Sequence, residues 1–220
     1  MTRMDVTQLL TQPDALYGRI RAALAADGAA LRPLPPGVRR AAVLLLLVHA
    51  GGEAALLLTK RSHTVDRHKG QVSLPGGVVE SNETPLDAAL REASEEIGVR
   101  AEDVTILGML DDEKTVVSGF MLTPFVGAIA YPYPLRVSPA EVQRVLEAPL
   151  RTLLDPENVK AEIWTDGGTP RTMYVYRLAG DIVWGATARI IMQFLRKVFG
   201  EAVPDGNHRG GSSAGHRARP

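Results

Sequence analysis

One stretch of the chain, residues 41–48, is apolar at every position, and it is the longest such run in the sequence. A helix that crosses a bilayer needs roughly 20 apolar residues, so this shorter run predicts a buried strand and not a membrane span. A second apolar stretch, residues 54–59, follows a glycine-containing turn at residues 50–53. Two such runs on either side of a short turn predict a β-hairpin.

The other elements are predicted from apolar spacing and from turn signals. Leu16, Ile20 and Leu24 recur on one face of a helix over residues 14–26. The remaining predictions are strands at residues 104–109, 121–129 and 173–178, helices at 84–97, 139–148 and 184–199, a proline-rich connector at 31–37 and a loop at 60–77. We expect three parts: a helix and connector over residues 1–37 packed on the domain, a catalytic domain over residues 38–203, and a disordered Gly, Ser, Arg and His-rich tail over residues 204–220.

The composition excludes several classes of protein and site. The chain of 220 residues has no cysteine, which excludes disulfides, thiolate catalysis and cysteine-ligated zinc. Its 25 Lys and Arg residues balance its 25 Asp and Glu residues, so no overall field favours nucleic acid or an anionic membrane. The first ten residues lack the pattern of a secretory signal. We therefore expect a cytoplasmic protein that binds neither nucleic acid nor membranes, and that recognises charged ligands through local clusters.

The helix predicted over residues 84–97 has clear signals at both ends. Thr84 is placed as its N-cap, Pro85 occupies the first helical position, and Asp87 lies where the partner in a capping box is found. Gly98 is suited to end the helix, because glycine readily adopts the left-handed conformation that follows a helix. The sequence therefore predicts both boundaries of this helix.

Three acidic residues of this helix, Glu92, Glu95 and Glu96, lie at spacings i, i+3 and i+4 and share one face. Their carboxylates repel one another, and a bound divalent cation removes that repulsion. Mg²⁺ takes oxygen ligands and bridges carboxylates to substrate phosphates. The alternative is an ordinary solvated acidic face. The preceding Gly76 and Gly77 favour the metal site, because glycine lets the backbone approach a metal or a phosphate closely.

A further pair connects the loop before the helix to the helix itself. Glu83 can form an ion pair with Arg91, which would hold the loop against the helix. The alternative is a surface ion pair worth at most about 1 kcal/mol.

Together these residues resemble the Nudix box, G-x5-E-x7-R-E-U-x-E-E-x-G-U, in which U is a bulky apolar residue. The match comprises Gly77, Glu83 and Arg91-Glu92-Ala93-Ser94-Glu95-Glu96-Ile97-Gly98-Val99, with Ala93 as the one soft position. The resemblance implies an α/β fold, an αβα sandwich with a mixed β-sheet, and a metal-dependent pyrophosphatase. It also implies Mg²⁺, or Mn²⁺ in its place, on Glu92, Glu95 and Glu96, a backbone carbonyl ligand near Gly76, and supporting catalytic roles for Arg91 and Glu83.

The expected chemistry follows from charge. A diphosphate repels an attacking water, and a bound metal ion neutralises that charge and lowers the pKa of a coordinated water. A nearby carboxylate then accepts the proton. The sequence leaves four candidates for this base, which are Glu95, Glu96, Glu113 and Glu141.

The segment before the box resembles the signature of coenzyme A pyrophosphatases, L-L-T-x-R-S followed by H-x-G-Q-V-x-F-P-G-G. Leu74 replaces the usual Phe, and Asp66 replaces a usual Arg, which brings the anion-binding character of this stretch into question. Coenzyme A carries a diphosphate and a 3′-phosphate, so its recognition needs cations beyond the metal. The alternative is a solvated basic loop. The resemblance implies substrate binding by Lys60, Arg61, Ser62, Arg67, His68, Lys69, Gly70 and Gln71.

A later segment, Trp184-Gly185-Ala186-Thr187-Ala188, resembles the W-G-x-T-A element of the same family. We expect Trp184 to lie in the core or to staple a helix, because large aromatic side chains are mostly buried. A ligand-stacking role is the alternative.

The predicted function is hydrolysis of coenzyme A or acyl-coenzyme A to 3′,5′-ADP and 4′-phosphopantetheine or its acyl form. One alternative is an ADP-ribose or nucleotide-sugar pyrophosphatase. An alternative of another class is a catalytically silent Nudix-like module that senses a nucleotide; such a module typically lacks a box glutamate, and this chain has them all. A homodimer is compatible with the sequence.

Overall fold

The computed structural model describes residues 5–62, 69–115, 119–166, 169–200 and 203. The predicted tail over residues 204–220 lies outside the described residues. Within them the chain forms two β-sheets and five α-helices with two short 3-10 helices, η1 (Ala101–Asp103) and η2 (Pro156–Asn158).

The larger sheet has eight strands and provides the frame of the site. They are β1 (Arg39–Ala50), β2 (Glu53–Arg61), β3 (Val72–Ser73), β4 (Gly76–Val78), β5 (Thr105–Met109), β6 (Glu113–Lys114), β7 (Phe120–Ala128) and β8 (Val142–Pro149). The order along the sheet is β3-β2-β1-β7-β5, while β4 pairs with β1, β6 with β7 and β8 with β2. β1 and β7 are parallel, whereas β1 and β2 are antiparallel. The sheet is therefore mixed.

Residues 41–48 of β1 are buried on both faces of the strand, which explains why this run is apolar at every position. Side chains alternate across a strand; Val43, Leu45 and Leu47 join one hydrophobic cluster, while Leu44 and Leu46 join the other. The register Leu46↔Leu57 pairs β1 with β2 as an antiparallel hairpin. The predicted strand and hairpin are confirmed.

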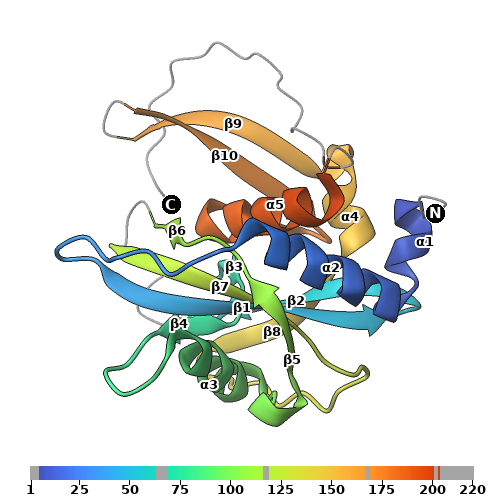
Figure 1. Cartoon of the computed structure of the whole chain (residues 1–220), viewed down its shortest axis with the longest axis horizontal. Coiled ribbons are helices and arrows are strands. Elements are labelled where there is room, and N and C mark those ends of the chain that lie inside the picture. The colour runs from blue at the N-terminus through green and yellow to red at the C-terminus, as the bar shows by residue number, and fades with distance from the viewer. Residues whose placement is uncertain (1–4, 63–68, 116–118, 167–168, 201–202, 204–220) are drawn as a thin grey trace.

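Helices cover both faces of this sheet (Figure 1). On one face lies α3 (Pro85–Ile97), which contacts β1 and β4. On the other lie α1 (Val6–Leu10), α2 (Pro13–Asp27), α4 (Leu150–Leu154) and α5 (Gly185–Phe199), all of which contribute to one core cluster. Beyond α5 lies a second sheet, with order β11-β10-β9, built from β9 (Val159–Asp166), β10 (Thr169–Leu178) and β11 (Asp181–Val183). The predicted α/β sandwich with a mixed sheet is confirmed.

The predicted helix at residues 139–148 is wrong, because residues 139–141 form a turn and residues 142–148 belong to β8. Apolar residues at positions 142, 145, 146 and 148 are compatible with either a helix or a half-buried strand. In the structure this segment pairs along β2 from Ala55↔Pro149 to Arg61↔Val142. The backbone groups at that edge of β2 need hydrogen-bond partners, and the strand supplies them. Likewise, the predicted loop at residues 60–77 contains β3 and part of β4.

The expected placement of Trp184 in the core is also wrong, since its side chain is 42% exposed, while the helix-staple role stays a prediction. Along β11, Asp181 and Val183 point inward, while Ile182 is exposed. Trp184 continues that alternation on the outward side, directly before α5.

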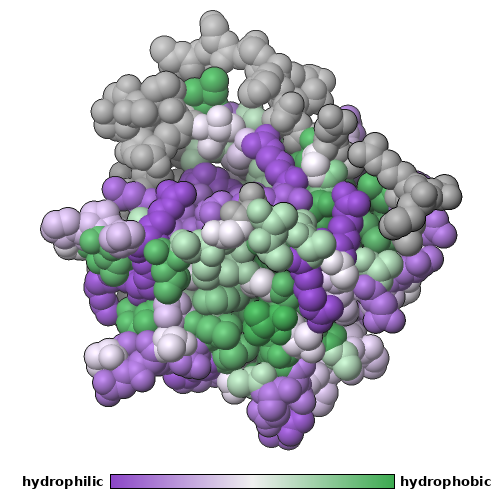
Figure 2. All heavy atoms as spheres, in the orientation of Figure 1, coloured by the Kyte–Doolittle hydropathy of each residue, from purple (hydrophilic) through white to green (hydrophobic). Residues whose placement is uncertain are grey.

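The surface mixes polar and apolar residues (Figure 2). In this view hydrophobic residues gather over β5, between α2 and α3. Ile106 and Met109 of β5 are half-buried. None of the helices in the described ranges has the length and hydrophobicity needed to span a membrane.

Candidate active site

The ends of α3 are held by its own sequence, as predicted. Thr84 Oγ1 accepts a hydrogen bond from the Asp87 amide at 3.2 Å, and Asp87 Oδ2 accepts one from the Thr84 amide at 3.0 Å. These two bonds form a capping box, with Pro85 in the first turn and Gly98 in the left-handed conformation after the helix. The capping box and the glycine therefore set the two ends of α3, the helix that carries the acidic residues.

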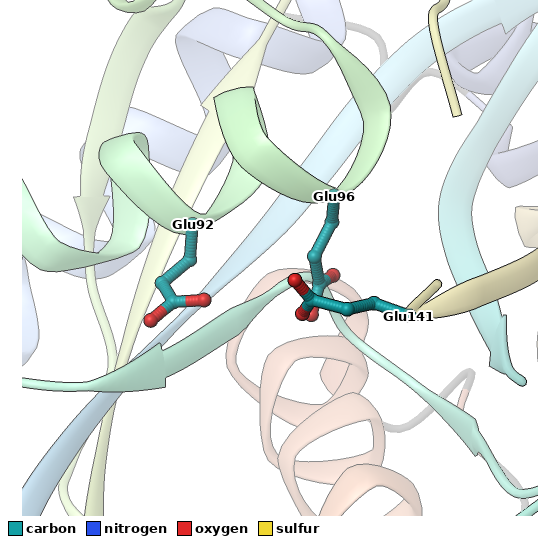
Figure 3. Close-up of side chains that lie close together, drawn as sticks. All are labelled: Glu92, Glu96 and Glu141. Carbon is teal, nitrogen blue, oxygen red and sulfur yellow. The ribbon is translucent and has the colours of Figure 1, made fainter. Parts of the chain in front are cut away.

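Small residues let α3 lie close to the sheet. Ala88, Ala89 and Ala93 are fully buried against it. Glu92 directly precedes Ala93, and Glu96 follows it by three positions. Both side chains are turned toward β4 and the start of β8 (Figure 3).

Three carboxyl groups meet at this position. Glu92 and Glu96 come from α3, and Glu141 comes from the residue just before β8, 45 positions further along the chain than Glu96. One oxygen of each lies within 4.8 Å of the others, and the three side chains point toward a common region (Figure 3). The sequence pattern singled out Glu141 only as one of four candidate bases.

Burial makes the charged form of Glu96 costly. Its side chain is 2% exposed, and this burial raises its pKa to about 8, against the opposing influence of the Arg61 guanidinium. Arg61 Nη1 lies 3.9 Å from Glu96 Oε1. Glu96 Oε2 has no hydrogen-bond partner among the described residues. Burial also raises the pKa of Glu92, with Arg91 acting in the opposite direction.

Two glycines allow the carboxylates to approach the backbone. A Cβ added to Gly77 would lie 2.1 Å from Glu92 Oε1, and one added to Gly76 would lie 2.3 Å from the carbonyl oxygen of Ala42. Gly76 also has φ of +148°. A side chain at Gly77 would therefore displace the Glu92 carboxylate, and one at Gly76 would disrupt the pairing of β4 with β1.

Arg91 is the centre of a hydrogen-bond network beside the three carboxylates. It donates to both oxygens of Glu83, at 2.9 and 3.0 Å, and to the carbonyl of Val78 at 3.2 Å. Its Nη1 donates to Glu92 at 3.0 Å and to Glu95 at 3.1 Å. Arg91 keeps the pKa of Glu83 below its usual value. The predicted Glu83–Arg91 pair is present, and it connects the loop before α3 to Glu92.

Glu95 occupies a different position from its two neighbours. Its side chain is 52% exposed and pairs with Arg91. Among the residues that the structure describes, the carboxyl cluster comprises Glu92, Glu96 and Glu141 and does not include Glu95. Glu113, another candidate base, pairs with Arg189 at 2.7 Å.

The chain matches the family model of the NUDIX domain over residues 38–166. This match covers more than half of the chain and includes the whole of α3 with its acidic residues. The chain belongs to the Nudix hydrolase family.

The relatives of this Nudix hydrolase agree with that assignment. A protein of Photorhabdus laumondii is 36% identical over 161 residues, covering 73% of this chain and 85% of that protein. One of Cronobacter sakazakii is 37% identical, covering 73% of this chain and 83% of that protein. Both are named uncharacterized Nudix hydrolase NudL. The crystal structure of a MutT/nudix family protein from Enterococcus faecalis has the same fold, with a TM-score of 0.54 and 17% identity, covering 90% of this chain and 75% of that one.

The cluster fits a divalent cation, the kind of ion that Nudix hydrolases use. Three carboxylates provide oxygen ligands, which suit hard cations such as Mg²⁺. Two of them are partly or fully desolvated, and the buried Glu96 Oε2 lacks a partner in the described structure. A cation would satisfy that oxygen and relieve the mutual repulsion of the three groups.

The predicted substrate residues fall into four groups in this Nudix hydrolase. Arg61 lies beside the cluster, and its Nε is buried without a hydrogen-bond partner among the described atoms. Lys60 instead pairs with Asp181 at 2.9 Å, a contact that no local sequence signal indicated. Ser62, Lys69, Gly70 and Gln71 lie at either end of the segment that follows β2, where the Gly70 amide donates to the Arg61 carbonyl and the Arg61 amide to that of Gln71. Arg67, His68 and the unusual Asp66 lie outside the described residues.

Proposed function

We propose that this Nudix hydrolase cleaves the diphosphate of coenzyme A or acyl-coenzyme A, giving 3′,5′-ADP and 4′-phosphopantetheine or its acyl form. The observation that carries the proposal is the position of the carboxyl cluster directly beside the end of β2. There Arg61, the arginine of the L-L-T-x-R-S part of the coenzyme A signature, has its Nη1 3.9 Å from Glu96 Oε1. The same strand end thus brings together residues suited to a metal and residues suited to a phosphate.

In this proposal Glu92, Glu96 and Glu141 hold Mg²⁺, for which Mn²⁺ can substitute. Such an ion supplies positive charge that neutralises the diphosphate and activates a water. Gly76 and Gly77 keep the backbone close to the carboxylates, and a Gly76 carbonyl ligand remains part of the proposal. Arg91 holds Glu92 in place through its bonds to Glu83 and Glu92. These residues orient the ligands before the substrate arrives, which is how such sites lower a barrier.

The proposed role of Arg61 is to bind the diphosphate. Arginine presents several N–H donors in a plane and forms strong hydrogen bonds with phosphate oxygens. The unpartnered, buried Nε of Arg61 supports this role, because a phosphate oxygen would satisfy it. Lys69, Arg67 and His68 are proposed to contribute further cations toward the 3′-phosphate.

The direct test is a panel of diphosphates with Mg²⁺, in which the products are identified by mass. We expect coenzyme A to be cleaved to 3′,5′-ADP, and dephospho-coenzyme A and ADP-ribose, which lack the 3′-phosphate, to be cleaved more slowly. Faster cleavage of ADP-ribose or a nucleotide sugar would replace the coenzyme A proposal with that alternative.

A substitution tests the metal site itself. Glu96→Gln keeps the size of the side chain but removes its charge, so we expect turnover to fall by roughly 100-fold or more. Glu102→Gln is the matched control, because Glu102 is exposed and pairs only loosely with Arg100, at 3.7 Å. Full turnover by Glu96→Gln would contradict the proposed metal site. A catalytically silent module would instead show no turnover in the wild type and would still bind its nucleotide in Glu96→Gln.

A further inference from the structure

Asp181 is a buried carboxylate in the second sheet, away from the Nudix box. It begins β11, its side chain is 6% exposed, and it accepts a hydrogen bond from Lys60 Nζ at 2.9 Å. Its other oxygen accepts one from Arg144 Nη2. Lys60 belongs to β2 and Arg144 to β8. Asp181, a residue of the second sheet, therefore contacts two neighbouring strands of the larger sheet.

Lys60 and Arg144 are directly opposite each other across the β2–β8 ladder. Like charges in a cross-strand pair repel each other and weaken the pairing of the strands. The carboxylate of Asp181 lies between the two cations and offsets this repulsion. β11 also contacts β3, so the edges of the two sheets meet at this point.

The register of β2 and β8 changes immediately beyond this pair. Lys60 is opposite Arg144, but Arg61 is opposite Val142, so Gln143 is an extra residue on β8. An extra residue of this kind bends a strand and redirects the side chains that follow it, and such irregularities are frequent beside active sites.

Two residues of the active site lie just past this irregularity. On β2, the guanidinium of Arg61 is 3.9 Å from Glu96. On the β8 side, Glu141 immediately precedes Val142, and its carbonyl accepts a hydrogen bond of 2.7 Å from the Ser62 amide. The pair Lys60 and Arg144 is thus the last regular pair before the chain turns both Arg61 and Glu141 toward the cluster.

We propose that Asp181 is a positioning residue for the active site: by holding Lys60 and Arg144 together, it fixes the β2–β8 irregularity that aims Arg61 and Glu141 at the carboxyl cluster. The role in turnover rests on the proposed function. The effect of Asp181 on Glu141 concerns the metal site alone and does not depend on which diphosphate is the substrate. Lys60 then serves the fold of the site through Asp181 and is not a direct substrate ligand.

The test compares Asp181→Asn with Glu53→Gln. The control removes a carboxylate from the other end of β2, where Glu53 pairs with Arg151 at 2.9 Å. Three quantities are measured well below the unfolding temperature: hydrogen exchange of the amides at residues 61 and 62, the affinity for Mn²⁺, and the turnover of coenzyme A. Both amides are hydrogen-bonded in the structure, so their exchange reports the geometry of the strand end.

For Asp181→Asn we expect faster exchange at residues 61 and 62, and a loss of about tenfold in Mn²⁺ affinity and in turnover. Glu53→Gln should leave all three quantities unchanged. In a Glu141→Gln background, Asp181→Asn should change the Mn²⁺ affinity by less than about twofold, because Glu141, the metal ligand that Asp181 positions, has already been replaced. An ion pair that serves only overall stability would lower the melting temperature without this dependence on Glu141.

Wild-type exchange and wild-type Mn²⁺ affinity in Asp181→Asn would overturn the proposal. If Asp181→Asn does not fold, Arg144→Met replaces it, since this variant keeps the Lys60–Asp181 contact; we expect the same changes in smaller measure, and their absence would equally overturn the proposal. If the wild-type protein cleaves no diphosphate of the panel, the proposed function has failed, while the exchange and Mn²⁺ measurements still decide the role of Asp181.

Discussion

At the scale of single residues, burial sets the charge state of Glu96, one of the proposed metal ligands. Desolvation raises its pKa to about 8, because a buried charge without a compensating partner is unfavourable. The proposed divalent cation would provide that partner, so binding of the ion and loss of the proton would be coupled.

This coupling predicts how pH affects the metal-free protein. The pKa of Glu96 is about 8 in the folded state and 4.5 as its reference value, so between these values the folded state binds the extra proton. The stabilisation from this group is complete below about pH 4.5, falls as pH rises, by up to roughly 1.4 kcal/mol per unit, and is lost above about pH 8.

Urea unfolding in chelator at about pH 5, 6.5 and 8 checks this prediction. The free energy of unfolding of the wild type, relative to that of Glu96→Gln, should decrease as the pH rises, because glutamine does not titrate. Saturating Mn²⁺ should remove the decrease. A pH-independent difference between the two proteins would contradict it.

Gly77 offers a second prediction at this scale. In Gly77→Ala the new Cβ would lie 2.1 Å from Glu92 Oε1, so the Glu92 carboxylate must move. We expect the Mn²⁺ affinity to fall by about tenfold, the scale of the loss when a ligand is no longer correctly oriented. Calorimetric titration with Mn²⁺ measures this affinity.

Gly18→Ala is its matched control, because nothing lies within 4 Å of a Cβ at this exposed position of α2. It should leave the Mn²⁺ affinity unchanged and stabilise the protein by roughly 0.5–1 kcal/mol, since alanine is favoured over glycine within a helix. Equal Mn²⁺ affinities for Gly77→Ala and Gly18→Ala would show that Glu92 does not need the space at Gly77.

At the scale of elements, α3 is specified by its own residues. The capping box of Thr84 and Asp87 satisfies backbone amides that would otherwise lack partners at its first turn. Thr84→Ala should therefore lower the free energy of unfolding by about 1 kcal/mol. Denaturant unfolding of Thr84→Ala and of Ser94→Ala, an exposed position within the same helix, measures the difference. Equal stabilities would show that the cap contributes nothing.

β8 is the opposite case, since its conformation depends on its neighbour. Its residues from Val142 onward are compatible with a helix when their apolar spacing is considered alone. Pairing with the whole edge of β2 overrides that local preference, because strand propensity depends on the neighbouring strand. As a consequence, Glu141 lies at the end of a strand and reaches Glu96, where a helix would have placed it elsewhere.

At the scale of the whole molecule, the N-terminal helices pack into the same core as the larger sheet. Leu16, Ile20 and Leu24 of α2 are buried in the cluster that also contains α5 and one face of β1. Asp112 attaches the connector to the larger sheet. It accepts a hydrogen bond from the Arg32 amide at 2.9 Å and forms a salt bridge with Arg40 of β1.

We therefore expect Ile20→Ala to destabilise the entire protein. Ile20 is fully buried, and truncation of a buried Ile to Ala costs about 2–5 kcal/mol. Denaturant unfolding followed by fluorescence and by circular dichroism should show one shared transition. The control, Leu31→Ala, truncates a side chain that is 49% exposed and should change stability by no more than about 0.5 kcal/mol. Separate transitions for the N-terminal helices and the sheet would contradict this expectation.

The sequence by itself determined the features that depend on neighbours along the chain. The capping residues set the ends of α3, the apolar run set β1, and the spacing from Gly77 to Gly98 indicated the family and a carboxylate site. All of these rest on helix and strand periodicity or on caps, which act over a few residues. Glu92, Glu96 and the Glu83–Arg91 pair followed from them.

Only the tertiary structure decided which distant groups share the site. It brought Glu141 to Glu96, left Glu95 on the exposed side with Arg91, and paired Lys60 with Asp181, 121 positions away. It also turned Trp184 outward. These outcomes depend on strand pairing and on the contact between two sheets, and such pairings join segments whose separation along the chain carries no local signal.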